Sequence, residues 1–128
     1  GCEQRNKQEK LMTIHPIQYG TLFATADDLN RRKIIAVQQI NSMTNVLQER
    51  HVRRTASVEL TPGDPQKILG WGRVDATGEW YLFITAPHSK RKPLLECTRE
   101  TIIGAATRLQ ALVDHLRDTL DAELARIS

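Results

Sequence analysis

The spacing of apolar residues changes twice along this chain, and this change constrains the fold more than any other feature. Between residues 26 and 51 one helical face recurs at intervals of four, three and four, formed by Ala36, Ile40, Met43 and Leu47. From 80 to 85 apolar residues occupy both alternating faces, as in a central strand. Beyond residue 98 the helical period returns. This order predicts an α+β fold in which an N-terminal helix, a three- or four-stranded antiparallel sheet and a long C-terminal helix on one face of the sheet follow one another.

Local signals give the expected boundaries of the sheet. Strands are predicted at 56–60, 68–74, 80–85 and 94–97. The run from Thr61 to Pro65 and the run from Asp75 to Gly78 carry turn residues. Gly70 and Gly72 interrupt the second strand, which indicates a bulge, a bend or a close approach of another part of the chain.

The two helices are expected at about 26–51 and 99–126. Thr25 and Asp28 form a capping-box pattern at the start of the first helix, and Thr98 can cap the second. The second helix would be about 40 Å long and would overhang a sheet whose strands span only ~17–20 Å. The residues expected in the core are Ile40, Leu47, Leu82, Ile84, Leu109, Val113 and Leu116.

The apolar stripe of the last helix continues into this overhang, and an exposed apolar stripe usually marks a partner. We therefore expect a homodimer through the helix. The alternative is an N-terminal arm that folds back over it. The predicted interface consists of Val113, Leu116, Leu120, Leu124 and Ile127.

Length and composition limit the class of protein. The 128 residues suit a single α+β domain over 12–128, preceded by a flexible leader or tag at 1–11. A hydrophobic content of 40% excludes a fully disordered chain, and no apolar run reaches the ~20 residues of a membrane span. Two cysteines do not suggest a disulfide framework, so the cytoplasm is the expected compartment. The alternative is a lipoprotein tether through Cys2, which heads a polar segment.

Residues that could carry catalysis do not form a recognisable set. The four histidines, His15, His51, His88 and His115, lack metal-ligand spacing to one another or to cysteine. Cys97 precedes a predicted helix, which can lower the pKa of a thiol, but no base lies near it in sequence. We therefore expect no catalytic residue, metal or cofactor, and an enzyme of unrecognised type remains the minor alternative.

Basic residues give the strongest functional signal. The net charge is +3, and three consecutive cations, Lys90, Arg91 and Lys92, lie in a predicted strand-connecting loop. Such a loop can hold phosphates without reading base sequence, or it can be a solvated turn that protects a sheet edge. The remaining predicted nucleic-acid contacts are Arg73, Trp71, Arg53 and Arg54, with Trp71 or Tyr81 as the aromatic platform on which a base could stack.

Three families share parts of this pattern. The stretch from Gly78 to Tyr81, through Lys90-Arg91-Lys92 to Thr98-Arg99-Glu100, resembles AP2-type and integrase arm-binding domains, which grip DNA with a three-stranded sheet and a helix. Four strands and a helix are also similar to small single-strand-binding coactivators, and the order helix, three strands, helix resembles a double-stranded-RNA-binding domain.

The function expected from these observations is a non-enzymatic, nucleic-acid-binding accessory or regulatory protein. The alternative is a small protein-interaction module, a regulator or inhibitor acting through its sheet or its C-terminal helix.

Overall fold

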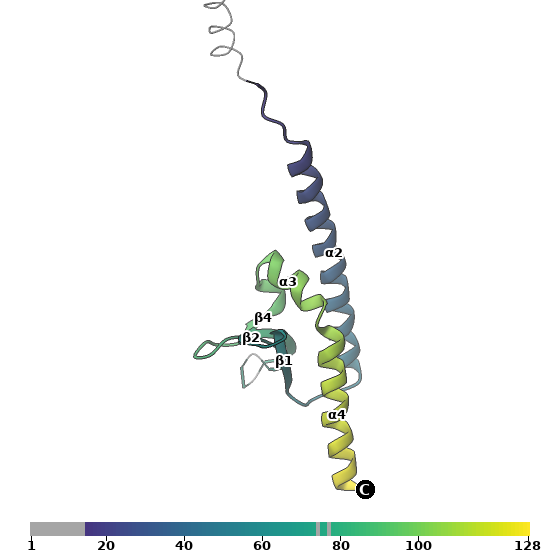
Figure 1. Ribbon diagram of the computed structural model, residues 1–128. Helices are drawn as coiled ribbons and strands as arrows, with labels where there is room; N and C mark the ends of the chain where they lie inside the picture. The colour runs from purple at the N-terminus through teal and green to yellow at the C-terminus, as the bar shows by residue number, and fades with distance from the viewer. Residues whose placement is uncertain (1–14, 74, 77) are drawn as a thin grey trace, which may run out of the picture.

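A computed structural model gives the structure of this chain and describes residues 15–73, 75–76 and 78–128. The elements, in chain order, are helix α2 (Gly20–Glu49), strands β1 (Ala56–Thr61), β2 (Asp64–Arg73), β3 (Trp80–Thr85) and β4 (Lys92–Pro93), the 3-10 turn η1 (Leu94–Glu96), and helices α3 (Arg99–Ala106) and α4 (Leu109–Ile127). The predicted α+β order is confirmed (Figure 1). The predicted leader at 1–11, with Cys2, lies outside the described residues.

The four strands form one antiparallel sheet in the order β1-β2-β3-β4. Trp71 pairs with Ala56 on one side and with Leu82 on the other, which puts these three side chains on the same face of the sheet. Gly70 pairs with Phe83, so these two residues lie on the opposite face.

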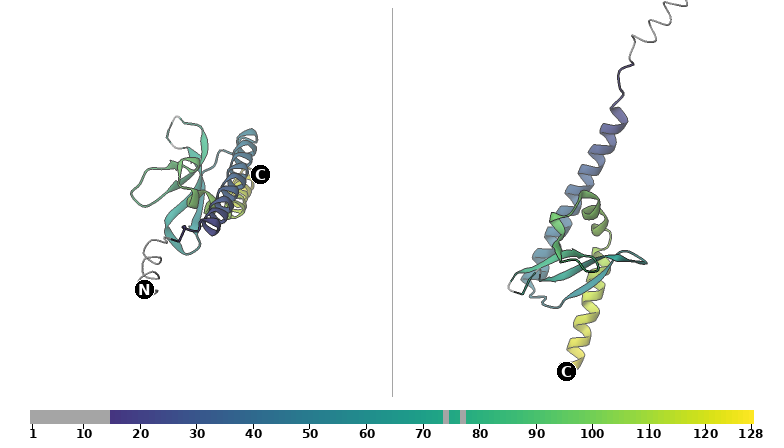
Figure 2. Two further views of the ribbon diagram at one scale, coloured as in Figure 1. Left: turned by 90° about the horizontal axis from the view of Figure 1, so that it is seen from above. Right: turned by 90° about the vertical axis from the view of Figure 1, so that its left-hand side faces the viewer.

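Helices α2 and α4 cover only one face of the sheet (Figure 2). The core between them contains Ala36 and Ile40 of α2 and the sheet residues Leu69 and Trp71; α4 contributes Leu109, Leu112 and Leu116. The two helices run in the same direction but are staggered. The first turns of α2 therefore project beyond one side of the sheet and the last turns of α4 beyond the other (Figures 1 and 2).

Helix α2 begins at Gly20, earlier than the predicted start at 26. Thr25 and Asp28 therefore lie inside the helix rather than at its cap, and Asp28 pairs instead with Arg32, one turn later, at 2.9 Å. Pro16 lies before the helix start, so nothing within the first turns breaks the helical hydrogen bonding.

The predicted C-terminal helix is two helices, because the chain bends at Thr107 and Arg108. The hydroxyl of Thr107 donates to the carbonyl of Gly104 at 2.6 Å, and Nε of Arg108 donates to the carbonyl of Glu59 in β1 at 3.0 Å. The first bond closes the end of α3, and the second anchors the bend to the sheet. The predicted cap is confirmed, since the Thr98 hydroxyl accepts from the amide of Thr101.

Two further expectations were wrong. The predicted strand at 94–97 is the turn η1, which follows a two-residue β4, because Leu94 enters the core instead of continuing along the sheet edge. Val113, expected in the core, is 38% exposed, because it faces the outer groove between α2 and α4. Within the described residues, no helix is long and apolar enough to cross a membrane.

Truncation of the central strand tests this core. Leu82 is 3% exposed, so Leu82→Ala should lower the free energy of unfolding by about 2–5 kcal/mol, the usual range for a buried leucine. Leu95→Ala is a matched control. Leu95 is 45% exposed, so this substitution should lower the free energy of unfolding by less than about 0.5 kcal/mol. Equal losses for the two variants in chemical denaturation would contradict the assignment of β3 to the core.

Candidate nucleic-acid interface

The open face of the sheet is built around Phe83. This side chain points away from the helices yet is only 2% exposed. A Cβ at Gly70 would overlap its ring, and a Cβ at Gly72 would lie 3.1 Å from it. The two glycines in β2 thus provide the space that the phenylalanine ring fills.

Arg91 covers the other side of that ring. Its guanidinium carbon lies 4.5 Å from the centroid of Phe83, a cation–π arrangement, and its Nη1 donates to the carbonyl of Arg73 at 2.8 Å. These contacts hold the basic loop against the end of β2. A Cβ at Gly72 would also lie 2.9 Å from Nη1 of Arg91, so this glycine admits the guanidinium as well as the ring.

A groove runs between this loop and the β2–β3 hairpin. Its lining residues are Arg73, Asp75, Ala76, Lys90 and Arg91. Lys92, the first residue of β4, is exposed but pairs with Ile84, whose side chain lies in the core, so Lys92 points to the face of the sheet opposite Phe83. The structure therefore brings Lys90 and Arg91 of the predicted phosphate-binding segment together with Arg73, and it leaves Lys92 outside the groove.

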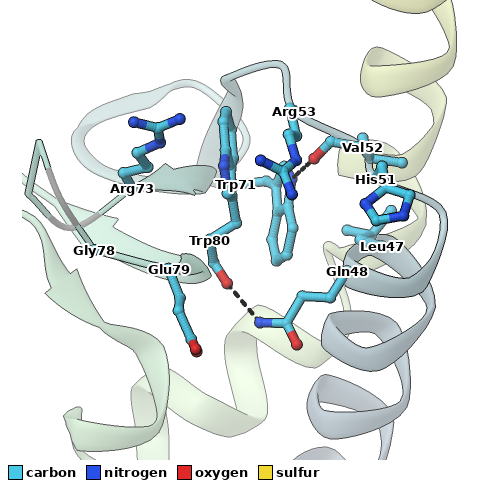
Figure 3. Close-up of a pocket in the computed structure, with 10 residues that line it drawn as sticks. All are labelled: Leu47, Gln48, His51, Val52, Arg53, Trp71, Arg73, Gly78, Glu79 and Trp80. Atoms are coloured by element: carbon cyan, nitrogen blue, oxygen red, sulfur yellow. Dashed lines mark hydrogen bonds between the residues drawn. The ribbon is translucent and has the colours of Figure 1, made fainter.

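A second cleft, of about 480 Å³, opens on the helix-covered side of the same hairpin (Figure 3). Arg73 of β2 and Arg53, which follows α2, line it together with His51 and Glu79. His51 has a φ of 53°, a left-handed conformation that reverses the chain after α2 and directs it toward the sheet. Arg73 thus lines both the cleft and the groove.

Two tryptophans form the floor and wall of the cleft. Trp71 is fully buried, and its Nε1 donates to the carbonyl of Val52 at 2.8 Å (Figure 3). Trp80 lies 6.1 Å from it between ring centroids, and the guanidinium carbon of Arg73 lies 5.5 Å from the ring of Trp80. A buried indole has no ring face open to a base, so Trp71 cannot serve as the predicted stacking platform.

Tyr81 lies on the open face beside the buried Phe83 and is 37% exposed. Its hydroxyl donates to the carboxylate of Glu79 at 3.3 Å, and the negative charge of Glu79 raises the pKa of Tyr81. The ring can therefore stack on a planar group while its hydroxyl stays protonated near neutral pH.

Arg54 is separated from this site. Its guanidinium makes two hydrogen bonds, of 2.9 and 2.6 Å, to the carboxylate of Glu123 in α4. The hydrogen bond raises the pKa of Arg54 and lowers that of Glu123. Arg54 thus connects the chain after α2 to the last helix, whereas its neighbour Arg53 lines the cleft.

Cys97 is partly buried, and its thiol donates to the carbonyl of Pro93 at 3.6 Å. Burial raises its pKa, which is the opposite of the change that activates a nucleophilic cysteine. Among the described residues, histidine, cysteine, aspartate and glutamate form no group of three that could hold a metal ion.

The close fit of Gly70 to Phe83 can be tested by substitution. Gly70→Ala should lower the free energy of unfolding by about 1–3 kcal/mol, because the new methyl group overlaps a ring held on its other side by Arg91. Gly104→Ala is the control. Nothing lies within 4 Å of its added Cβ, and alanine favours a helix more than glycine does, so the free energy of unfolding should rise by about 0.5–1 kcal/mol. A tolerated Gly70→Ala would show that Phe83 is not held in this position.

No protein family, no functionally described protein and no solved structure matches this chain in comparisons with known proteins. The three resemblances drawn from the strand and helix pattern therefore have no support beyond that pattern. What the site can bind follows from its own geometry and charge.

Proposed function

We propose that this chain is a non-enzymatic nucleic-acid-binding protein that contacts phosphates through the basic edge of its sheet. The observation that carries the proposal is the position of Arg73, which lines both the groove beside the basic loop and the cleft beside Arg53. The cations Arg53, Arg73, Arg91 and Lys90 thereby follow one another around one end of the sheet. We call these four residues the basic rim.

The guanidinium groups of the rim keep donors for a ligand. Arg91 donates one N–H to the Arg73 carbonyl and lies against Phe83, which fixes its position. A guanidinium carries five N–H donors, so the others remain able to bind phosphate oxygens. A prepositioned arginine loses less side-chain freedom on binding than one that moves freely in solvent.

Two carboxylates limit what the rim can contact. Asp75 lines the groove and Glu79 lines the cleft. Their charge opposes deep entry of a phosphate, so contact is made by the ends of long basic side chains at the surface. Such contacts fix the position of a strand without reading its sequence. Tyr81, on the open face beside the hairpin, replaces Trp71 as the proposed stacking residue for a single strand.

Removing the loop charges tests the proposal. Replacing Lys90, Arg91 and Lys92 together with Ala should weaken binding to all sequences. The dependence of log affinity on log salt should also flatten, by about one unit for each phosphate that the variant no longer neutralises. Because Arg91 also covers Phe83, a second variant, Lys90→Ala with Lys92→Ala, removes charge and leaves the Phe83–Arg91 stack in place.

The matched control removes equal charge elsewhere, by replacing Arg31, Arg32 and Lys33 of α2 with Ala. A binding loss equal to that of the loop variant would mean that only total charge matters. If the wild-type protein binds no DNA or RNA at low salt, where charge attraction is strongest, the nucleic-acid proposal fails and the protein-interaction module takes its place.

We also propose that the protein associates with itself, at least as a dimer, through the exposed stripe of α4. Leu124 and Ile127 are 60% and 78% exposed, and Leu120 is partly buried beside them. Val113 contributes from the groove between α2 and α4. Leu116 does not belong to this surface, because it is 3% exposed and packs in the core of its own chain. The low cysteine content fits action in a reducing compartment such as the cytoplasm.

Sedimentation equilibrium tests this association. Replacing Leu120 and Leu124 with Glu should yield a folded monomer, because these side chains lie beyond the sheet and contribute little to the core. Circular dichroism would check that the variant keeps its helices. A wild-type protein that is already monomeric at high concentration would contradict self-association.

A further inference from the structure

Two helical segments project beyond the body of the molecule at opposite ends (Figures 1 and 2). The first, the α2 overhang, comprises residues 20–29, which precede the hydrogen bond from Arg99 to Asn30. The second, the α4 overhang, comprises residues 117–127, which follow the last buried residue, Leu116. At 1.5 Å per residue both are about 15 Å long.

The α2 overhang is stabilised within its own chain by exposed contacts, the stack of Tyr19 on Phe23 and the pair of Asp28 with Arg32. Its N-cap residue, Tyr19, makes no side-chain capping bond, and its first turn contains no acidic residue. The segment contains glycine, threonine, phenylalanine and aspartate, which are weak helix formers, and an isolated helix of this length is unstable in water. Leu22 and Phe23 are nevertheless 60% and 58% exposed.

We propose that the α2 overhang of one copy packs in parallel against the α4 overhang of a second copy. This inference rests on the proposed self-association through α4 and assigns the surface that α4 meets. The contact joins the two opposite ends of the molecule, so it is a head-to-tail contact rather than a pairing of two identical surfaces.

The apolar residues of the two overhangs have the same spacing. Leu22, Ala26 and Leu29 recur at intervals of four and three, as do Leu120, Leu124 and Ile127. A single parallel offset therefore aligns all three pairs, Leu22 with Leu120, Ala26 with Leu124 and Leu29 with Ile127. Neither stripe is fully covered within its own chain.

The space for a second helix is already defined by packing within one chain. Met43 and Leu47 of α2 line the same groove as Leu109 and Val113 of α4, so α2, which ends at Glu49, stops alongside the middle of α4. The α2 overhang of a second copy would enter below that end, in line with the first α2, and repeat the same parallel arrangement. Because the two overhangs have about the same length, the contact can extend along the whole of both.

The chosen offset brings opposite charges together near both ends of the contact. The chosen offset places the uncapped start of α2 beside Asp118, and a carboxylate at a helix N-terminus compensates the positive end of the helix dipole. It also places Asp28 beside Arg126, which forms no ion pair with another described residue. The α2 overhang carries two carboxylates and no cation, and the α4 overhang carries three carboxylates and two arginines, so net charge does not separate this contact from an α4–α4 contact. An α4–α4 contact would, however, leave the α2 stripe exposed.

A mixing experiment tests the proposal. The α2 variant carries Leu22→Glu and Ala26→Glu, and the α4 variant carries Leu120→Glu and Leu124→Glu. Each alone should be monomeric in sedimentation equilibrium. An equimolar mixture should form pairs and nothing larger, because one intact α2 overhang and one intact α4 overhang remain. The molar mass of the wild-type protein should exceed that of a pair, whether the assembly is an open chain or a closed ring. Ile34→Glu is the control, since Ile34 is 59% exposed on α2 outside the stripe and should behave as wild type.

The outcomes separate this inference from the broader proposal. A monomeric wild type would overturn both. An α2 variant that associates like wild type, or a mixture that stays monomeric while both variants remain folded by circular dichroism, would overturn the head-to-tail contact and leave self-association through α4 standing. If the α2 variant fails to fold, Leu22→Ala provides the same test and should weaken association by about tenfold. Binding of an oligonucleotide short enough for one protomer measures the basic rim independently.

Discussion

The hydrogen bond from the Trp71 indole to the carbonyl of Val52 joins the long helix to the sheet. Trp71 is fully buried near the end of β2, and Val52 follows the left-handed residue that ends the reversal after α2. An indole N–H buried without an acceptor would be costly, so the bond fixes where the chain leaves the helix. From that point Arg53 enters the cleft, while Arg54 turns to Glu123 of α4. Directly after this buried contact, the two neighbouring arginines separate, one to the basic rim and one to the last helix.

Periodicity was sufficient to predict the order of the elements, because burial on one side of a helix or sheet determines the spacing of apolar residues directly. It was sufficient for the 80–85 strand and for most of the core. It failed at the bend between α3 and α4, where the apolar spacing continues from Ile102 to Leu109 without interruption. That bend depends on Arg108 reaching the carbonyl of Glu59, a contact 49 positions away in sequence. The early start of α2 was missed because the capping signal at Thr25 is also compatible with a helix interior.

The sequence indicated which charged residues belong to the candidate site, but not which aromatic residues face the open side of the sheet. Trp71 and Tyr81 are both aromatic strand residues, and sequence does not say which face of a sheet receives the helices. The register settles this, since Trp71 lies opposite Leu82 and Tyr81 opposite Gly72. The interruption of β2 by Gly70 and Gly72 was the available signal for the Phe83–Arg91 stack. It indicates a close approach but not the group that approaches, because only the fold brings residue 83 and residue 91 onto these glycines.

The two proposed surfaces have a joint consequence. A single basic rim offers few phosphate contacts, and its affinity falls steeply with salt. A head-to-tail contact through the overhangs would repeat that rim once per copy, at intervals of about the 45 Å length of α2, along one assembly. A strand bound to one rim would then meet the next at a high effective concentration, so weak individual contacts would add into tight binding without any base-specific interaction. By linkage, the nucleic acid would favour assembly to the same degree that assembly favours nucleic-acid binding. Such a coupled system requires two features, apolar overhangs that are not covered within one chain and a basic rim that binds weakly by itself.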